Sequence, residues 1–184
     1  LFPYTTLFRS MMIYIAAVTG MRYAEVAGIT RDAIDFSNQT ISINKTWDYK
    51  YRTGFKKTKT AASVRIVTVD TNTISVLKQY LSFNSVDDFR PIFLVNHRIL
   101  VSTQINQVLK SKLKELNLPA ITFHALRHTH ASVLLYKGVS VLSVSKRLGH
   151  SNVTTTQSTY LHIIKELEAQ DQSQIIKIIG LVDH

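Results

Sequence analysis

Apolar residues recur at helical spacing along most of the chain and alternate with polar ones in part of its first half. Residues 11–19 are apolar on nearly every side and precede Gly20, which predicts a buried helix with a glycine stop. A second, short helix is predicted over residues 21–28. The alternating, β-branched runs 40–44 and 64–69 predict strands of a hairpin or a three-stranded antiparallel sheet.

The pattern changes to helical spacing after residue 70. Amphipathic helices are predicted over residues 72–83 and 102–117, and a third over 123–138 with Thr122 as its N-cap. The sequence therefore predicts an α+β fold that is mostly α-helical, with a small antiparallel β-sheet or hairpin.

Three shorter signals follow in the last third of the chain. Ser140 is predicted to cap a helix that ends at Gly149, and Ser151 to cap another that carries Tyr160. Residues 153–156 are a β-branched run with poor helix propensity, so we expect tertiary contacts to hold this helix. Residues 163–184 form an amphipathic tail that must dock on its own domain or on a neighbour.

Composition narrows the class of partner. The chain has 184 residues, 22 Lys+Arg against 12 Asp+Glu, a net charge of +10 and no cysteine. The excess of positive charge favours a polyanion such as nucleic acid, although ribosome-associated and membrane-surface proteins are equally basic. The lack of cysteine excludes disulfides and thiolate chemistry and fits a cytoplasmic location. No apolar run is long enough to span a bilayer, so we expect no membrane partner.

Residues 1–10 resemble the translation of a sequencing adapter more than they resemble protein. We therefore predict that they are non-native and that the natural protein extends further towards its N-terminus. The expected organisation is a non-native segment at 1–10, an N-terminally truncated catalytic domain at 11–165 and a C-terminal tail at 166–184.

Basic and aromatic residues are interleaved between the two predicted strands. Such a surface suits tracking of a nucleic-acid backbone, whereas the alternative is an edge sheet protected by its lysines. The candidate DNA-binding residues are Lys45, Lys50, Arg52, Lys56 and Lys57, and Lys59 lies in the same turn.

The N-terminus of the helix after Thr122 is a candidate phosphate site. His124 and Arg127 stand three residues apart on its first turn, where unpaired backbone N–H groups and the positive end of the helix dipole also lie. His124 and His128 have the spacing of metal ligands, but the arginine between them would repel a metal ion, so we expect no metal. Taken alone, Arg22 is interpreted as a helix-surface residue that forms an ion pair with Glu25.

Read together, these segments carry a compound signature. Thr19-Gly-Met-Arg-Tyr-Ala-Glu25, Lys59 in a basic turn, His124-Ala-Leu-Arg127, Leu148-Gly-His150 and Tyr160 follow one another in the order and spacing of the tyrosine recombinases. From about residue 11 to its end, the chain resembles the catalytic domain of this superfamily, which includes the phage integrases. The sequence of these motifs is similar to that of integrases of Gram-positive phages and integrative elements.

The resemblance implies a role for each matched residue. Arg22 and Arg127 would bind the scissile phosphate, because arginine offers forked donors and keeps its proton. His150 would donate a further hydrogen bond, and His124 would take part in proton transfer. Tyr160 would be the nucleophile, and Lys59 would protonate the leaving 5′-oxygen. Glu25 would support Arg22 by orienting it.

The resemblance also implies partners and chemistry. The expected function is site-specific cleavage and rejoining of double-stranded DNA through a 3′-phosphotyrosine, without metal, ATP or other cofactor. Four protomers would act together, the tail would be exchanged between them, and an accessory protein would set the direction of recombination. The alternatives are a type IB topoisomerase and a DNA-binding fragment that has lost catalysis. The family usually carries further N-terminal helices and a domain that clamps the DNA, which are not seen here.

Overall fold

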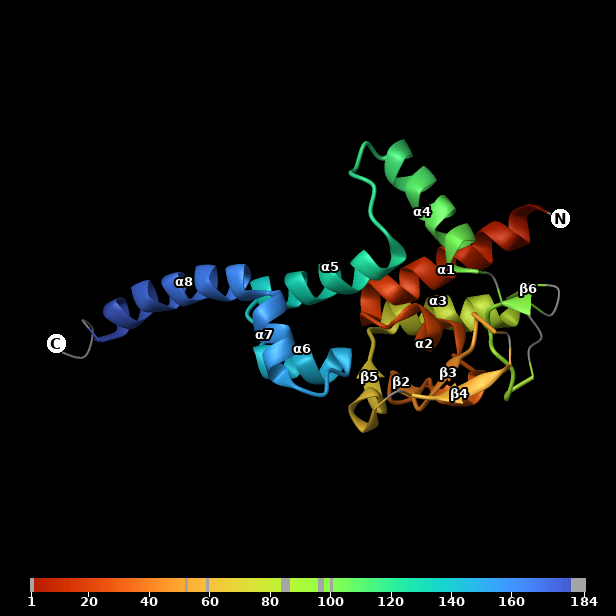
Figure 1. The fold of residues 1–184 in the computed structure, drawn as a ribbon, viewed down its shortest axis with the longest axis horizontal. Coiled ribbons are helices and arrows are strands. Elements are labelled where there is room, and N and C mark those ends of the chain that lie inside the picture. The colour runs from red at the N-terminus through yellow and green to blue at the C-terminus, as the bar shows by residue number, and fades with distance from the viewer. Residues whose placement is uncertain are drawn as a thin grey trace.

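The computed structural model describes residues 2–51, 53–58, 60–83, 87–95, 98–99 and 101–179. Helices dominate this part of the chain, and Figure 1 gives their order in space. The helices are α1 (Phe2–Thr19), α2 (Tyr23–Ala27), α3 (Thr71–Ser82), α4 (Ser102–Glu115), α5 (Phe123–Tyr136), α6 (Val141–Leu148), α7 (Val153–Thr159) and α8 (Leu161–Ile179), with 3-10 turns η1 (Arg31–Ala33) and η2 (Ala61–Ser63).

The strands are short and antiparallel. They are β1 (Ile34–Asp35), β2 (Thr40–Ile43), β3 (Lys45–Trp47), β4 (Phe55–Lys57), β5 (Arg65–Thr68), β6 (Leu94–Val95) and β7 (Arg98–Ile99). One sheet has the order β1-β2-β5, and β3-β4 and β6-β7 are two-stranded hairpins. The predicted α+β class, mostly helical with a small antiparallel sheet, is thus confirmed.

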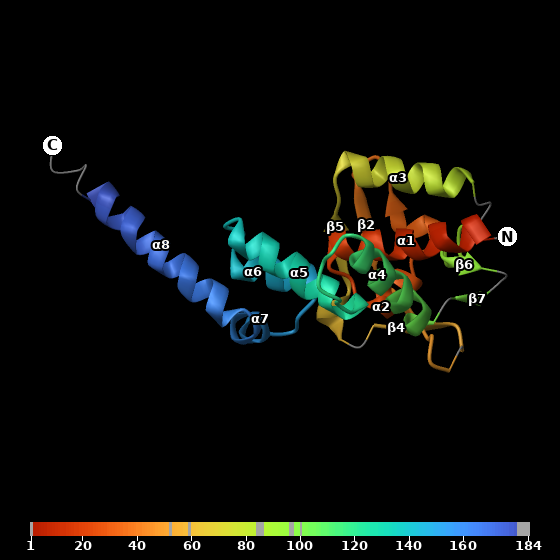
Figure 2. The ribbon, with the colours of Figure 1, turned by 90° about the horizontal axis from the view of Figure 1, so that it is seen from above.

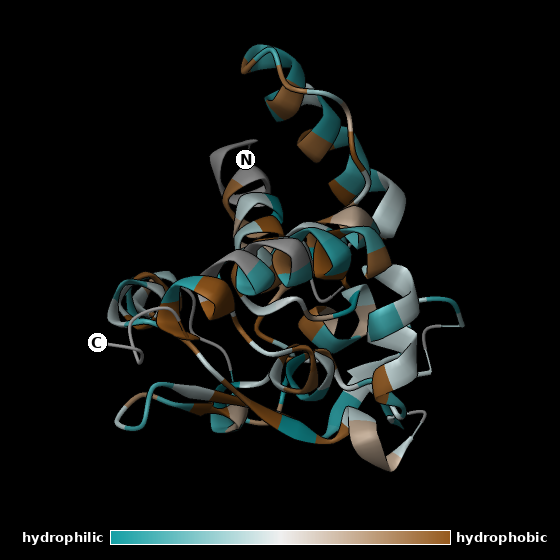
Figure 3. Cartoon of the chain, turned by 90° about the vertical axis from the view of Figure 1, so that its left-hand side faces the viewer, coloured by the Kyte–Doolittle hydropathy of each residue, from teal (hydrophilic) through white to brown (hydrophobic). Residues whose placement is uncertain are grey.

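A main hydrophobic core surrounds α1. Met12, Ile15 and Ala16 are fully buried there, α1 contacts α5 and α4, and the same core contains the sheet residues Ile41 and Ile43. Figure 2 shows α3 on one side of α1 and α4 on another, with β2 and β5 close by. In Figure 3 most helices carry both apolar and polar colours, which is typical of amphipathic helices.

A second, smaller core joins the C-terminal helices. It contains Ala131 and Leu135 of α5, Val144 and Leu148 of α6, and Tyr160 just before α8, with Ile163 completing it. Beyond this contact α8 leaves the rest of the chain in both views (Figures 1 and 2). The helix runs without a break through residues 165 and 166, the expected boundary between the catalytic domain and the tail.

Several helix ends lie where local rules place them. Thr122 caps α5 by accepting the N–H of Ala125 at 3.3 Å, and Ser140 caps α6 by accepting the N–H of Ser143 at 3.2 Å. Gly149 ends α6 with φ 71°, a left-handed conformation that suits glycine. These three predictions are confirmed.

The cap of α7 was predicted wrongly. Asn152, rather than Ser151, accepts the N–H of Thr154, at 2.9 Å, and Tyr160 follows the last residue of this helix instead of lying within it. Asparagine and serine are equally good caps, so the local sequence could not separate them. The β-branched α7 is held as expected by tertiary contact, since Thr156 is fully buried.

Residues 2–10 continue α1 towards the N-terminus, and α1 therefore begins nine residues before the predicted start at residue 11. The ring of Phe8 is 7% exposed and meets Tyr80 edge-on, with centroids 5.4 Å apart. The foreign origin of residues 1–10 stays a prediction.

Candidate active site

The turn between α1 and α2 brings the first arginine into place. Gly20 has φ 70°, and a Cβ added there would lie 2.7 Å from Cδ2 of His130, so this position requires glycine. Arg22 follows as the N-cap of α2. The carboxylate of Glu25 accepts the backbone N–H of Arg22 at 2.8 Å and its guanidinium at 3.1 Å, which fixes the side chain from both ends.

The carboxylate of Glu25 is shared with a second arginine. Arg65 of β5 donates to both Glu25 oxygens, at 3.1 and 2.9 Å, and the two side chains are only 7% and 2% exposed. Burial alone would raise the pKa of Glu25, but the hydrogen bonds and charges of Arg65 and Arg22 outweigh it and lower the pKa below its usual value. Glu25 is therefore ionised and holds Arg22 as a charged acceptor.

Arg127 enters from the first turns of α5 and is almost fully buried. Its guanidinium donates to the carbonyl oxygens of Gly20 at 2.8 Å and Leu148 at 2.7 Å. Burial and the nearby charge of Arg22 lower its pKa to about 10, so the group still carries its charge at neutral pH. Arg127 thus ties together the turn before Arg22 and the turn before His150.

His150 lies directly after the left-handed Gly149. Its Nδ1 is 2.7 Å from Oγ1 of Thr156, which orients the ring. Burial and the positive charges of Arg127 and Arg22 lower the pKa of His150 to about 4. The imidazole is therefore neutral at neutral pH and keeps one N–H to donate.

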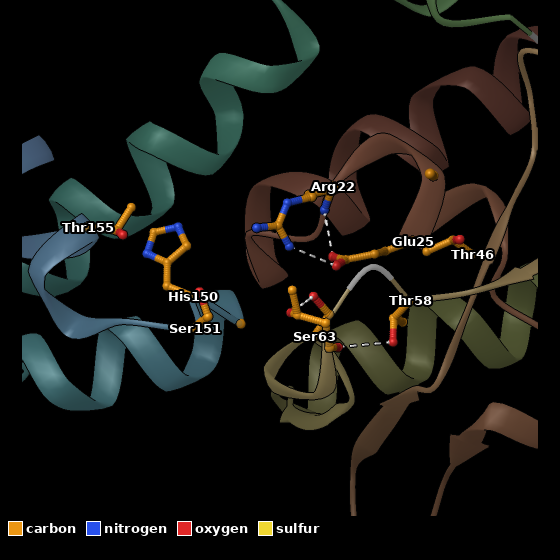
Figure 4. Close-up of a pocket in the computed structure, with 11 residues that line it drawn as sticks. Arg22, Glu25, Thr46, Thr58, Ser63, His150, Ser151 and Thr155 are labelled. Atoms are coloured by element: carbon orange, nitrogen blue, oxygen red, sulfur yellow. Dashed lines mark hydrogen bonds and ion pairs between the residues drawn. The ribbon is translucent and has the colours of Figure 1, made fainter.

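A cavity of about 400 Å³ lies between these groups. Figure 4 shows Arg22 and Glu25 on one side of it and His150, Ser151 and Thr155 on the other. The arginine side chain remains 39% exposed, so its guanidinium is accessible from this cavity. A cavity bordered by Arg22 and His150, with Arg127 close enough to perturb the pKa of His150, is suited to an anion.

Tyr160 lies at the edge of this group in the small core. Its ring is 3% exposed, and its hydroxyl is 3.0 Å from Nδ1 of His128. Burial raises the pKa of Tyr160 above its usual value, while the charge of Arg127 acts in the opposite direction. The described structure therefore holds the phenol protonated and hydrogen-bonded within the protein.

His124 is exposed on the first turn of α5, and its ring meets His128 edge-on with centroids 5.2 Å apart. Burial and the charges of His128, Arg127 and Arg22 lower its pKa, so it is neutral at neutral pH and able to accept a proton.

Comparison with known proteins agrees with this geometry. The model of the phage integrase family matches residues 5–166, which is most of the chain. The chain belongs to the phage integrase family.

The relatives of this chain include integrases of phages and mobile elements of Gram-positive bacteria, as the resemblance predicted. The integrase of Staphylococcus phage L54a is 30% identical over 181 residues, covering 91% of this chain and 51% of that protein. The ICEBs1 integrase of Bacillus subtilis is 25% identical over 186 residues, covering 94% and 50%. The chain thus spans about half the length of the curated relatives it matches.

Solved structures share the fold. The Tn1549 transposon integrase in complex with transposon right end DNA has a TM-score of 0.70 and 24% identity, covering 82% of this chain and 53% of that one. The XerA recombinase has a TM-score of 0.64 and 22% identity, covering 89% and 62%. Integrases and recombinases recur among these proteins, which does not favour the topoisomerase alternative.

The integrase fold brings most of the predicted residues together. Arg22, Glu25 and His150 border one cavity, and Arg127 and His124 interact electrostatically with them. Lys59 and Arg52 lie outside the described residues, although Thr58 and Thr60, the neighbours of Lys59, line the same cavity.

The basic stretch between the two predicted strands was expected to be a turn, but part of it forms a hairpin of its own, β3-β4, which packs against α2. Lys50, Lys56 and Lys57 are exposed and Lys45 is partly so. Two of the four are engaged within the protein, because Lys45 pairs with Asp32 at 3.7 Å and Lys56 pairs with the largely buried Asp48 at 2.6 Å. Their contact with DNA stays a prediction.

The N-terminus of α5 was predicted to offer unpaired backbone N–H groups to a phosphate, and for two of these groups the prediction is wrong. Oδ1 of Asn106 accepts the N–H of Phe123 at 2.7 Å, and Thr122 accepts the N–H of Ala125. Arg127 also turns inward, to the carbonyls of Gly20 and Leu148. The protein itself thus occupies these two backbone donors and the guanidinium of Arg127, whereas Arg22 and His150 border an open cavity.

Two functional side chains were missed or undervalued. Arg65 was not considered, although it stands two residues before the buried Val67 and so faces inward on an alternating strand. A charge on the buried side of a strand signals an ion pair, because an unpaired one is too costly. The sequence drew attention to His128 only through its spacing from His124, yet in the structure His128 contacts the hydroxyl of Tyr160.

His130 links the site to the α1 helix and makes stability depend on pH. Its Nδ1 is 2.9 Å from the carbonyl oxygen of Ala17, so it carries the proton, and Nε2 accepts from Arg147 at 2.9 Å. Arg147 also donates to the carbonyls of Thr68 and Val18, each at 3.0 Å. Burial and the charge of Arg147 lower the pKa of His130 to about 4.

We therefore expect the protein to lose stability in mild acid. The folded pKa of His130 lies below its unfolded value of 6.5, so its contribution is complete above that value and is lost as pH falls towards 4. Urea unfolding at about pH 7 and about pH 5 measures the difference. His130→Gln should reduce this pH dependence, and an equal dependence in that variant would contradict the assignment.

Proposed function

We propose that the full-length protein containing this chain is a site-specific recombinase that cleaves and rejoins double-stranded DNA through a 3′-phosphotyrosine at Tyr160. The observation that carries the proposal is the cavity bordered by Arg22 and His150, with the buried Arg127 and Tyr160 close by. Family membership supports the same chemistry.

The cationic groups would act on the scissile phosphate. Arg22 presents a partly exposed guanidinium whose orientation is set by Glu25, and His150 brings a neutral N–H donor. Arg127 adds a fixed positive charge behind them. Donors placed in advance in a partly buried site stabilise the charge that develops on a pentacoordinate phosphorus.

The covalent step is an exchange of esters. The oxygen of Tyr160 would bond to phosphorus, and the bond from phosphorus to the 5′-oxygen would break. The phenol proton would pass to His124, whose lowered pKa leaves it free to accept one, and Lys59 would protonate the leaving oxygen. Because one phosphodiester replaces another, the step needs no ATP, and the positive charges of Arg22 and Arg127 would stabilise the phosphorane without a metal ion.

The nucleophile has to change partners before it reacts. In the described structure the hydroxyl of Tyr160 contacts His128 and its ring is buried. The β-branched helix α7 before it is held by contacts rather than by its own propensity, so a shift there costs little local helix energy. We propose that assembly on DNA moves Tyr160 towards the phosphate.

The DNA-binding surface would include the hairpin β3-β4, where exposed lysines alternate with Tyr51 and Phe55.

Four copies would act on two duplexes, with residues 166–184 exchanged between them. Exposed isoleucines near the end of α8, at positions 175, 176, 178 and 179, suit such a contact. An accessory protein would set direction, and the reaction would take place in the cytoplasm. In the part of the chain that the structure describes, no helix is long and apolar enough to cross a membrane.

A trapping experiment tests the function. The full-length protein is incubated with a library of nicked duplexes of random sequence, so that the short strand released by cleavage diffuses away. We expect a covalent protein–DNA adduct that survives denaturant, forms in EDTA and is absent from Tyr160→Phe. An adduct that persists in Tyr160→Phe, or no adduct from the wild type, would overturn the proposal.

A further inference from the structure

Arg65 carries the most heavily bonded buried guanidinium that we find in the described residues. It donates from Nη1 and Nη2 to the two oxygens of Glu25, from Nε to the carbonyl of Arg147 at 2.6 Å, and from Nη1 to the carbonyl of Ser63 at 3.0 Å. Its side chain is 7% exposed. With these donors in use, Arg65 has no evident means of binding DNA directly.

The four acceptors belong to different parts of the active site. Glu25 leads to Arg22, because one carboxylate bridges the two guanidinium groups. Arg147 is near the C-terminal end of α6, three residues before His150. The guanidinium of Arg65 therefore contacts residues that support both sides of the cavity. On one side it binds Glu25, which holds Arg22, and on the other it binds the end of α6, which precedes His150.

Close packing strengthens the second of these links. A Cβ added at Gly149 would lie 2.8 Å from Nη1 of Arg65, so the backbone next to His150 rests against the guanidinium. Arg127 donates to the following carbonyl, that of Leu148. Arg65 and Arg127 thus bind consecutive carbonyls at the end of α6, where the helix dipole favours positive charge.

We propose that Arg65 is a positioning residue, which holds Arg22 through Glu25 and His150 through the end of α6 at the separation that a scissile phosphate requires. The inference rests on the proposed recombinase function. Arg127 joins the neighbouring carbonyls of Gly20 and Leu148, but Arg65 is the arginine that also holds Glu25, and a bidentate pair with a carboxylate fixes direction as well as distance.

Geometry explains why lysine could not replace this residue. A single ammonium can hold one oxygen of Glu25 but cannot also span the second oxygen and the carbonyl of Arg147. The ion pair would survive in part while the connection between the two sides of the cavity would be lost. Arg65→Lys therefore separates positioning from the mere presence of a buried positive charge.

The test is a single-turnover measurement in the full-length protein on a nicked duplex that traps the adduct. We expect Arg65→Lys to lower the rate constant of adduct formation by about 10²-fold at saturating protein, because small displacements of reacting groups have effects of that size. DNA affinity should change far less. A purely structural role would reduce the fraction of active protein, hence the amplitude, but not this rate constant.

Two further variants keep the test decisive. Arg31→Lys is the matched control, since Arg31 pairs with Asp88 at the surface, and it should leave the rate constant unchanged. Glu25→Asp is the second variant, to be used if Arg65→Lys folds poorly. It keeps the charges of residues 25 and 65 but shortens the carboxylate side chain that joins Arg65 to Arg22. It should therefore lower the rate constant of adduct formation as Arg65→Lys does. A wild-type rate constant in both Arg65→Lys and Glu25→Asp overturns the inference. Absence of adduct from the wild type overturns the proposed function instead.

Discussion

Replacing Arg127 by lysine should lower the rate of covalent adduct formation by about 10²–10³-fold, the loss found when a preorganised donor is removed from a site of developing negative charge. The structure gives a second reason. The guanidinium of Arg127 bridges the carbonyls of Gly20 and Leu148, 2.8 and 2.7 Å away, and an ammonium cannot reproduce that fork. The turns that carry Arg22 and His150 would lose their common support.

DNA affinity should fall only slightly in Arg127→Lys, because the positive charge is kept and the residue is only 4% exposed. Single-turnover adduct formation and equilibrium binding to the same duplex measure the two effects. Arg31→Lys serves again as the control, because Arg31 is exposed, pairs with Asp88 and does not line the cavity. Equal losses of binding and cleavage would make Arg127 a binding residue rather than a catalytic one.

Glu25→Gln should destabilise the fold by about 3–5 kcal/mol, because it leaves the buried charge of Arg65 without a counter-charge. The carboxylate is 2% exposed and the guanidinium 7%, so water cannot easily replace the lost partner. The contribution has a pH dependence of its own. Since the pKa of Glu25 is lowered in the fold, this stabilisation is present above its unfolded value of 4.5 and is lost as pH falls below it.

Urea unfolding of the wild type and Glu25→Gln at neutral pH measures this effect. Glu115→Gln is the matched control, because Glu115 forms an exposed pair with Lys112 in which both side chains are 56% exposed. Such a pair contributes at most about 1 kcal/mol. A similar small change for both variants would mean that the ion pair of Glu25 and Arg65 adds nothing to stability.

Local chemistry made much of the fold predictable. The helix caps Thr122 and Ser140, the glycine stop at Gly20 and the alternation over β2 and β5 depend on neighbours within a few residues, and they formed as expected. Asn152 was missed because two equally good caps stand side by side, and only packing chooses between them.

Long-range contacts set the parts that were missed. Arg65 meets Glu25 across 40 residues and Arg147 across 82, and no periodic pattern encodes such pairs. Tyr160 meets His128 across 32 residues, so its partner in the described structure could not be read from its own segment. Arg127 likewise lies near the predicted phosphate site but turns its donors to backbone carbonyls.

The sequence by itself indicated the family and the chemistry proposed for this chain, because the residue types able to bind and attack a phosphate are few and their order along the chain is distinctive. Tertiary structure alone decided how those residues are held. Glu25 and Arg65 become one buried ion pair, and Arg127 joins two turns, only when β5, α2 and α6 pack together. The physical reason is burial, since a charge removed from water must find its partner wherever the fold places one.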